Sequence, residues 1–324
     1  MQVERTKPEV RVAVVQAQPA AFRRDEGIDR SCELLLKAAE QGAQLVLFPE
    51  AYVPAYPRGL SFGTLVGSRS RSGRELWQRY WEQAVEVPSA ATEQLAEAVR
   101  AASVELAIGV VEKDTNYSRA TLYCSLLHFG ADGRLRNVHR KLKPTAAERL
   151  IWGEGDGSTL NVAETPLGRI GGLICWENMM PLARMALYGQ GVEIYLAPTA
   201  DQREVWQATL RHIALEGRCF VLGSNQYQTR ASLPADMRAW DEVAALPETL
   251  SRGGSAIYSP LGEILAGPLY DEEGILYATL DRDELTRARY DFDVVGHYAR
   301  PDVFQLQIHR QVKPPVMFDD DPPA

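Results

Sequence analysis

The 324-residue sequence is acidic, with a formal net charge of −8 at pH 7 and a pI near 5.3. This balance argues against nucleic acid as the main partner, because phosphate binding favours a basic surface. Apolar residues make up 45% and charged residues 24%, as in ordinary globular domains, and no apolar run approaches the ~20 residues of a membrane span. The first ten residues contain no apolar signal-peptide core, so we expect a protein with no signal peptide and no membrane partner.

Short β-type runs alternate with amphipathic stretches along the chain. The patterns predict, in order, a strand at 11–18, a helix from Ile28, a strand at 43–50, a helix at 89–102 capped by Ser89, strands at 104–113, 121–129 and 169–178, a helix at 181–189, a strand at 193–199, a helix at 203–216 and a strand at 219–226. A late hairpin is predicted from 254–260 and 274–280, with PLGE as its turn. This alternation predicts an α/β fold in which helices cover the sheets, and several antiparallel neighbours make the sheets mixed.

No shift in composition marks a domain boundary, so residues 1–310 are expected to form a single domain. Residues 228–252 are poorly patterned and are interpreted as a surface or partner loop. Residues 311–324 are rich in Pro and Asp and are expected to form a loose C-terminal tail.

The four cysteines are Cys32, Cys124, Cys175 and Cys219, and none forms a CxxC pair or a metal-ligand spacing. We therefore expect free thiols in a reducing cytoplasm, with no metal. Cys124 and Cys219 lie within apolar strands and are interpreted as core residues.

The context of Cys175 differs from that of the other cysteines. It follows an apolar run in GGLICWENMM (171–180), where a predicted strand ends shortly before a predicted helix. Such a turn exposes a side chain at the carboxyl edge of a sheet, and its N–H groups are expected to lower the thiol pKa and to form an oxyanion hole. On spacing alone, Cys175 is as consistent with packing as with catalysis.

A nucleophilic cysteine needs a base, but the five histidines form no convincing pair with Cys175. Glu50, after the strand at 43–50, and Lys141, in NVHRKLKPT, are the other charged candidates. Glu50 is also consistent with a helix-start acid or a salt-bridge partner, and Lys141 with a solvated basic strand. The residues alone thus suggest a Cys–Glu–Lys trio without excluding these alternatives.

Five segments together resemble the nitrilases, a branch of the carbon–nitrogen hydrolase superfamily. They occur in the family's order from about residue 10 to about residue 305, and they are FPEAYVPAYPRG, HRKLKPTAAERLIWGEGDGSTL, GGLICWENMMPLAR, RHIALEGRCFVLGSNQ and DVVGHYARPDVF. One such motif would be weak evidence for the family, whereas five motifs in register are specific to it. The resemblance implies a four-layer α-β-β-α sandwich and assembly into homo-oligomers, from dimers to helical filaments. Candidate assembly segments are the helices within 181–216, the 228–252 loop and the C-terminal region.

The resemblance also implies the roles of individual residues. Cys175 is the expected nucleophile, Glu50 the general base and Lys141, rather than Lys143, the stabilising ammonium. Glu148 is a fourth member, although Glu154 lies nearby. The expected substrate-binding residues are Tyr56, Trp176 and Thr199, and the expected oxyanion donors are Lys141 and the N–H of Trp176.

The implied reaction converts an organic nitrile into a carboxylic acid and ammonia through a thioimidate and a thioester on Cys175, without a cofactor. Three alternatives remain. An amidase of the same superfamily would use the same trio, and a relative within the branch would act on cyanide itself. A non-catalytic α/β binding or assembly protein would carry Cys175 as a structural, unreactive thiol.

Overall fold

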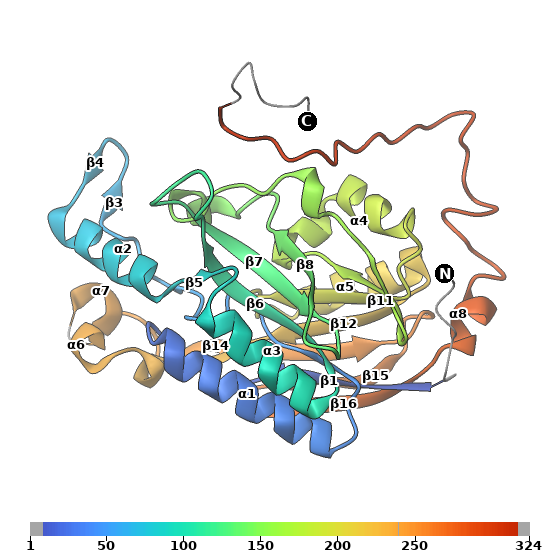
Figure 1. Cartoon of the computed structure of the whole chain (residues 1–324), viewed down its shortest axis with the longest axis horizontal. Coiled ribbons are helices and arrows are strands. Elements are labelled where there is room, and N and C mark those ends of the chain that lie inside the picture. The colour runs from blue at the N-terminus through green and yellow to red at the C-terminus, as the bar shows by residue number, and fades with distance from the viewer. Residues whose placement is uncertain (1–8, 239, 317–324) are drawn as a thin grey trace.

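The computed structural model describes residues 9–238 and 240–316. Two large mixed sheets pack face to face, and helices cover both outer surfaces (Figure 1), which confirms the predicted α-β-β-α sandwich. The first sheet has the order β16 (Gly274–Asp281), β1 (Glu9–Gln16), β2 (Leu45–Leu47), β6 (Glu105–Lys113), β7 (Leu122–Phe129), β8 (Leu135–Arg140), with β5 (Val85–Glu86) beside β6. The second has the order β13 (Tyr227–Thr229), β14 (Thr249–Tyr258), β12 (Phe220–Asn225), β11 (Ile194–Thr199), β10 (Gly168–Gly172), β9 (Ala163–Thr165), with β15 (Ile264–Tyr270) beside β14.

The layering follows from side-chain alternation along the buried strands. In β1, Val12 and Val14 face the second sheet, whereas Ala13 and Val15 face the helices α1 (Arg24–Glu40) and α3 (Ala90–Ala102). A stretch of strand with both faces covered is apolar at every position, as residues 12–15 of β1 are. The outer face of the second sheet is covered in the same way by α4 (Pro181–Tyr188) and α5 (Trp206–Gly217).

Local signals predicted several boundaries closely. Ser89 caps α3 as expected, because its side chain accepts a hydrogen bond from Thr92 N and the Thr92 side chain accepts one from Ser89 N. The helix expected from Ile28 already begins at Arg24. The structure also contains α2 (Arg71–Gln83) and the small hairpin of β3 (Thr64–Leu65) and β4 (Ser68–Arg69), which no predicted element covers.

The predicted late hairpin is wrong. The PLGE turn joins β14 to β15, and the GILYATL segment forms β16, which pairs antiparallel with β1 in the opposite sheet. A turn signal identifies where the chain reverses, but the partner of the next strand depends on the tertiary fold.

The poorly patterned 228–252 stretch contains several short elements, which are η4 (Arg230–Ser232), α6 (Ala235–Arg238), α7 (Asp241–Ala244) and the start of β14. Met237 and Val243 are buried, so this segment packs on the body. Beyond α8 (Asp283–Ala288), the chain runs in an extended form along the side that carries α4 (Figure 1), and Lys313 N donates to Asp156 Oδ2 at 3.2 Å. Residues 317–324 of the expected tail lie outside the described residues, and the boundary at 310 stays a prediction. Within the described ranges, no helix is long and apolar enough to cross a membrane.

Candidate active site

Glu50 lies in the turn that follows β2, between the two sheets. Its side chain is completely buried, and its backbone oxygen accepts a hydrogen bond from Gln226 Nε2 at 2.7 Å. Gly109 of β6 permits this position, because a Cβ there would lie 2.2 Å from the backbone oxygen of Pro49. The close approach of the turn to β6 therefore holds the Glu50 carboxylate in the interior.

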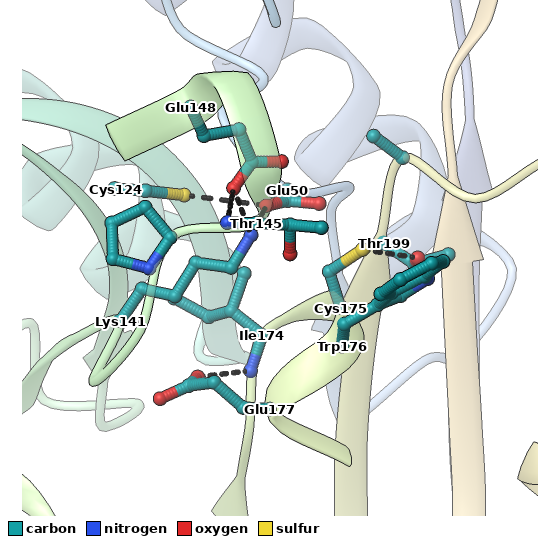
Figure 2. Close-up of polar contacts among 12 residues, drawn as sticks. Glu50, Cys124, Lys141, Thr145, Glu148, Ile174, Cys175, Trp176, Glu177 and Thr199 are labelled. Carbon is teal, nitrogen blue, oxygen red and sulfur yellow. Dashed lines mark hydrogen bonds and ion pairs between the residues drawn. The ribbon is translucent and has the colours of Figure 1, made fainter. Parts of the chain in front are cut away.

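Lys141 directly follows β8 and is also completely buried. Its Nζ donates to Glu50 Oε1 at 2.6 Å and to Glu148 Oε2 at 2.7 Å (Figure 2). Glu148 lies in the short helix η1 (Ala146–Leu150), and its Oε2 also accepts from Thr145 N at 2.7 Å. One ammonium thus bridges two carboxylates from separate segments. The alternatives Lys143 and Glu154 pair with each other at the surface.

Cys175 begins the short helix η3 (Cys175–Met179), three residues after β10 ends, so the predicted strand at 169–178 is too long. Its φ of 53° is unusual for a residue other than glycine, and such strain is typical of functional turns. The sulfur accepts a hydrogen bond from Thr199 Oγ1 at 3.2 Å, and the side chain lies beside the Glu50 carboxylate (Figure 2). The side chains of Cys175, Glu50 and Lys141 therefore meet in one place.

The electrostatics of the resting site differ from the sequence-based expectation. Burial and the negative charge of Glu50 raise the pKa of Cys175 to about 12, so the expected lowering of its pKa is wrong. Burial also raises the pKa of Glu50, and it outweighs the ammonium of Lys141, which acts in the opposite direction. For Lys141 burial lowers the pKa, but Glu50 and other negative neighbours outweigh it and the pKa lies well above its usual value. The thiol of Cys175 is therefore neutral at rest and lies beside a carboxylate of increased basicity.

The two oxygens of Glu50 have different surroundings. Oε1 accepts from Lys141 and also from the thiol of Cys124, at 3.6 Å. Oε2 is buried with no hydrogen-bond partner among the described residues, and Figure 2 shows it on the side of Cys175. Lys141 and Cys124 thus fix one oxygen and leave the other available to accept the proton of Cys175.

A pocket of about 280 Å³ leads to the sulfur. Its walls are formed by Tyr56, Arg58, Thr145, Glu148, Cys175, Trp176, Ala200, Asp201, Gln202 and Arg203. At the mouth, Asp201 accepts hydrogen bonds from Trp176 Nε1 at 2.9 Å and from Arg203 Nη2 at 2.6 Å. Within the described ranges, no cluster of three or more His, Cys, Asp or Glu side chains is arranged to hold a metal ion.

The three predicted substrate-binding residues occupy different places. Tyr56 lines the pocket, and its hydroxyl donates to Glu148 Oε1 at 2.7 Å. Trp176 lines the pocket and is 38% exposed. Thr199 is buried and contacts the sulfur.

Sequence reasoning missed several residues around this site. Cys124 is a buried core residue as expected, but it also contacts the Glu50 carboxylate, and nothing in its apolar strand indicates this. Arg58, Asp201 and Arg203 were also missed. Asp201 and Arg203 lie two and four residues after the carboxyl end of β11, a position that could have suggested them.

The carbon–nitrogen hydrolase family model matches residues 11–290 of the chain. An aliphatic nitrilase of Sinorhizobium fredii is 50% identical over 309 residues, covering 95% of this chain and 98% of the relative. A bifunctional nitrilase/nitrile hydratase of Lupinus angustifolius is 49% identical over 315 residues, covering 96% of this chain and 89% of the relative. Among solved structures, a carbon–nitrogen hydrolase of Helicobacter pylori has a TM-score of 0.71 at 20% identity, covering 91% of this chain and 97% of that one, and this likeness concerns the fold. The chain belongs to the carbon–nitrogen hydrolase family and, within it, to the nitrilases.

Proposed function

We propose that the pocket at Cys175 hydrolyses organic nitriles to carboxylic acids and ammonia. The observation that carries this proposal is the arrangement of a thiol beside a buried carboxylate that is itself bound to a buried ammonium. Because the thiol is neutral at rest, a base must remove its proton during attack. The free oxygen of Glu50 faces Cys175 and accepts this proton.

The first half of the reaction forms a thioimidate. The sulfur of Cys175 bonds to the nitrile carbon as its proton moves to Glu50, and Glu50 then returns the proton to the nitrile nitrogen. A water molecule adds to the same carbon and gives its proton to a carboxylate, for which Glu50 and Glu148 are the candidates. Because burial raises the pKa of Glu50, this group accepts and returns protons more readily near neutral pH than an exposed glutamate does.

The second half releases the products. The carboxylate returns the first proton of the water to the nitrogen, and the new hydroxyl gives up the second as its oxygen becomes a carbonyl. The carbon–nitrogen bond breaks, ammonia leaves, and a thioester remains on Cys175. A second water releases the acid and restores the thiol. Charge that develops on the attacked group is stabilised by Lys141 and by the N–H of Trp176, which lies in the first turn of η3, where N–H groups have no partner within the helix.

The pocket favours short aliphatic nitriles. Its volume of about 280 Å³ is below the 300–1,000 Å³ typical of sites for drug-sized ligands, so a small substrate fits it best. The name of the Sinorhizobium fredii relative, an aliphatic nitrilase, supports the same substrate class. The relative from Lupinus angustifolius is named for two activities, so release of the amide is a second candidate outcome.

A panel of aliphatic, aromatic and arylacetic nitriles, each with its matched amide, tests the proposal. We expect ammonia and acid from short aliphatic nitriles, with Cys175→Ala inactive as a control. Faster turnover of the amides would favour an amidase, and turnover of cyanide alone would favour the cyanide-acting alternative. No turnover, together with a Cys175 that resists iodoacetamide, would favour a binding protein.

We also propose that the chain forms a homo-oligomer through the face carrying α4 and α5. Leu182 on α4 is 67% exposed and Val205, just before α5, is 60% exposed, so apolar side chains face outward here. Light scattering on the purified chain measures the mass, and a monomer at all concentrations would contradict this proposal.

A further inference from the structure

Glu177 lies two residues after the nucleophile, but its carboxylate points away from the pocket. The side chain is completely buried, and its Oε2 accepts a hydrogen bond from Ile174 N at 2.7 Å (Figure 2). Its Oε1 accepts from Leu142 N at 2.5 Å. Ile174 directly precedes Cys175, and Leu142 directly follows Lys141. One carboxylate therefore joins the two backbone segments that carry the nucleophile and the ammonium.

His139 holds this carboxylate from the opposite side. It is the penultimate residue of β8 and is buried, and its Nε2 lies 3.0 Å from Glu177 Oε2 and 3.2 Å from Oε1. Because an ionised carboxylate only accepts hydrogen bonds, Nε2 carries the proton and donates. The other ring nitrogen, Nδ1, lies 3.2 Å from Thr159 Oγ1, which fixes the plane of the ring.

The two segments that Glu177 joins come from different sheets. Lys141 follows β8 of the first sheet, and Cys175 follows β10 of the second. Packing between sheets is set by apolar side chains, which tolerate small shifts, whereas hydrogen bonds from three N–H groups to one carboxylate impose a specific geometry. The hydrogen bonds of Glu177 therefore control the distance between Cys175 and Lys141 more directly than the packing of the distant core does.

We propose that Glu177 and His139 form a clasp that sets the position of Cys175 relative to Lys141. Both are positioning residues, since neither lines the pocket. The catalytic meaning of the clasp rests on the proposed function, because that function assigns the roles of Cys175 and Lys141. A misplacement of about 1 Å at reacting groups can cost about a hundredfold in rate, so a loosened clasp acts mainly on turnover.

Two substitutions break the clasp at different points. Glu177→Gln keeps the size of the side chain but replaces one acceptor oxygen by an NH2 group. This NH2 group faces one of the two backbone N–H groups, so only the other N–H keeps its hydrogen bond. In His139→Leu the donor is lost, whereas His139→Gln retains an N–H donor of similar reach. The chain offers a matched control in a second buried pair, His128 and Glu105, whose Nε2 and Oε2 atoms lie 2.9 Å apart.

The experiment measures kcat, KM and thermal midpoint for E177Q, H139L, H139Q and the control H128L on a short aliphatic nitrile. We expect kcat to fall about tenfold to a hundredfold in E177Q and H139L, with KM within about threefold of the wild type. We expect H139Q to recover most of the lost kcat. H128L should keep its kcat even if its midpoint falls as far as that of H139L.

Several results would overturn the clasp. One is a folded E177Q or H139L with kcat within about twofold of the wild type, a change too small for displaced reacting groups. Others are an equal loss of kcat in H128L, or no recovery in H139Q. If E177Q does not fold, the three histidine variants decide the question.

If the wild type hydrolyses no nitrile, the proposed function fails but the clasp is still testable. The rate of iodoacetamide labelling at Cys175, read by peptide mass spectrometry, should then change in E177Q and H139L and stay at the wild-type value in H128L. Equal labelling rates in all variants would overturn the clasp.

Discussion

Replacing Lys141 by Met tests the centre of the site most directly. Methionine keeps the length and apolar volume of the stem but removes the ammonium, so the buried carboxylates of Glu50 and Glu148 lose the donor that lies 2.6 Å and 2.7 Å from them. Removing one partner of a buried ion pair costs about 3–5 kcal/mol, because the remaining charge stays desolvated. At about 2 °C per kcal/mol for a chain of this size, the thermal midpoint should fall by about 6–10 °C. Turnover should fall by about 10²–10³, the usual effect of losing one donor to a developing charge.

The double variant Lys141→Met with Glu148→Gln separates the two effects. Neutralising Glu148 removes one of the two negative charges left behind, so the midpoint should rise again by the equivalent of at least about 1 kcal/mol, while turnover stays low. The assay combines thermal unfolding with ammonia release from a short aliphatic nitrile. An unchanged midpoint in Lys141→Met, with no gain on adding Glu148→Gln, would refute the buried ion-pair reasoning. Wild-type turnover in Lys141→Met would instead support the alternative that Lys141 is only part of a solvated basic strand.

Four further predictions concern the thiol and its neighbours. Cys175→Ala should lose all turnover but remain folded, as circular dichroism would show. Turnover at the wild-type level in this variant would show that Cys175 is not the nucleophile. Glu50→Gln should shift the thiolate absorbance titration of Cys175 to lower pH, because the charge of Glu50 contributes to raising that pKa to about 12, and an upward shift would contradict the stated cause. In the wild type the acid limb of kcat/KM should lie above pH 4.5, the ordinary value for a glutamate, because the pKa of Glu50 is raised and activity is lost as Glu50 gains a proton. Cys124→Ala should lower kcat by about two- to fivefold, since a weak S–H···O bond contributes about 0.5–1 kcal/mol, and Cys124→Ser should restore it. A Cys124→Ser enzyme no better than Cys124→Ala would indicate that Cys124 acts by packing alone.

Much of the fold followed from local pattern. Nearly continuous apolar runs such as 43–50 marked strands covered on both faces, and Ser89 after Pro88 marked the start of α3. Pairing was harder to predict, because the partner of a strand depends on contacts far along the chain. The GILYATL segment pairs with β1, more than 250 residues earlier in the sequence, and no turn signal encodes that choice.

The layered α/β class, the family resemblance and the candidates Cys175, Glu50 and Lys141 could all be read from the chain, because motifs and apolar periodicity are properties of neighbouring residues. Three findings required the folded structure: these side chains meet, Cys124 and Glu177 lie next to them, and the resting thiol has a raised pKa. The physical reason is that burial and charge act through space. The pKa of a thiol depends on the groups brought within a few ångströms by the packing of two sheets, and those groups come from distant parts of the chain.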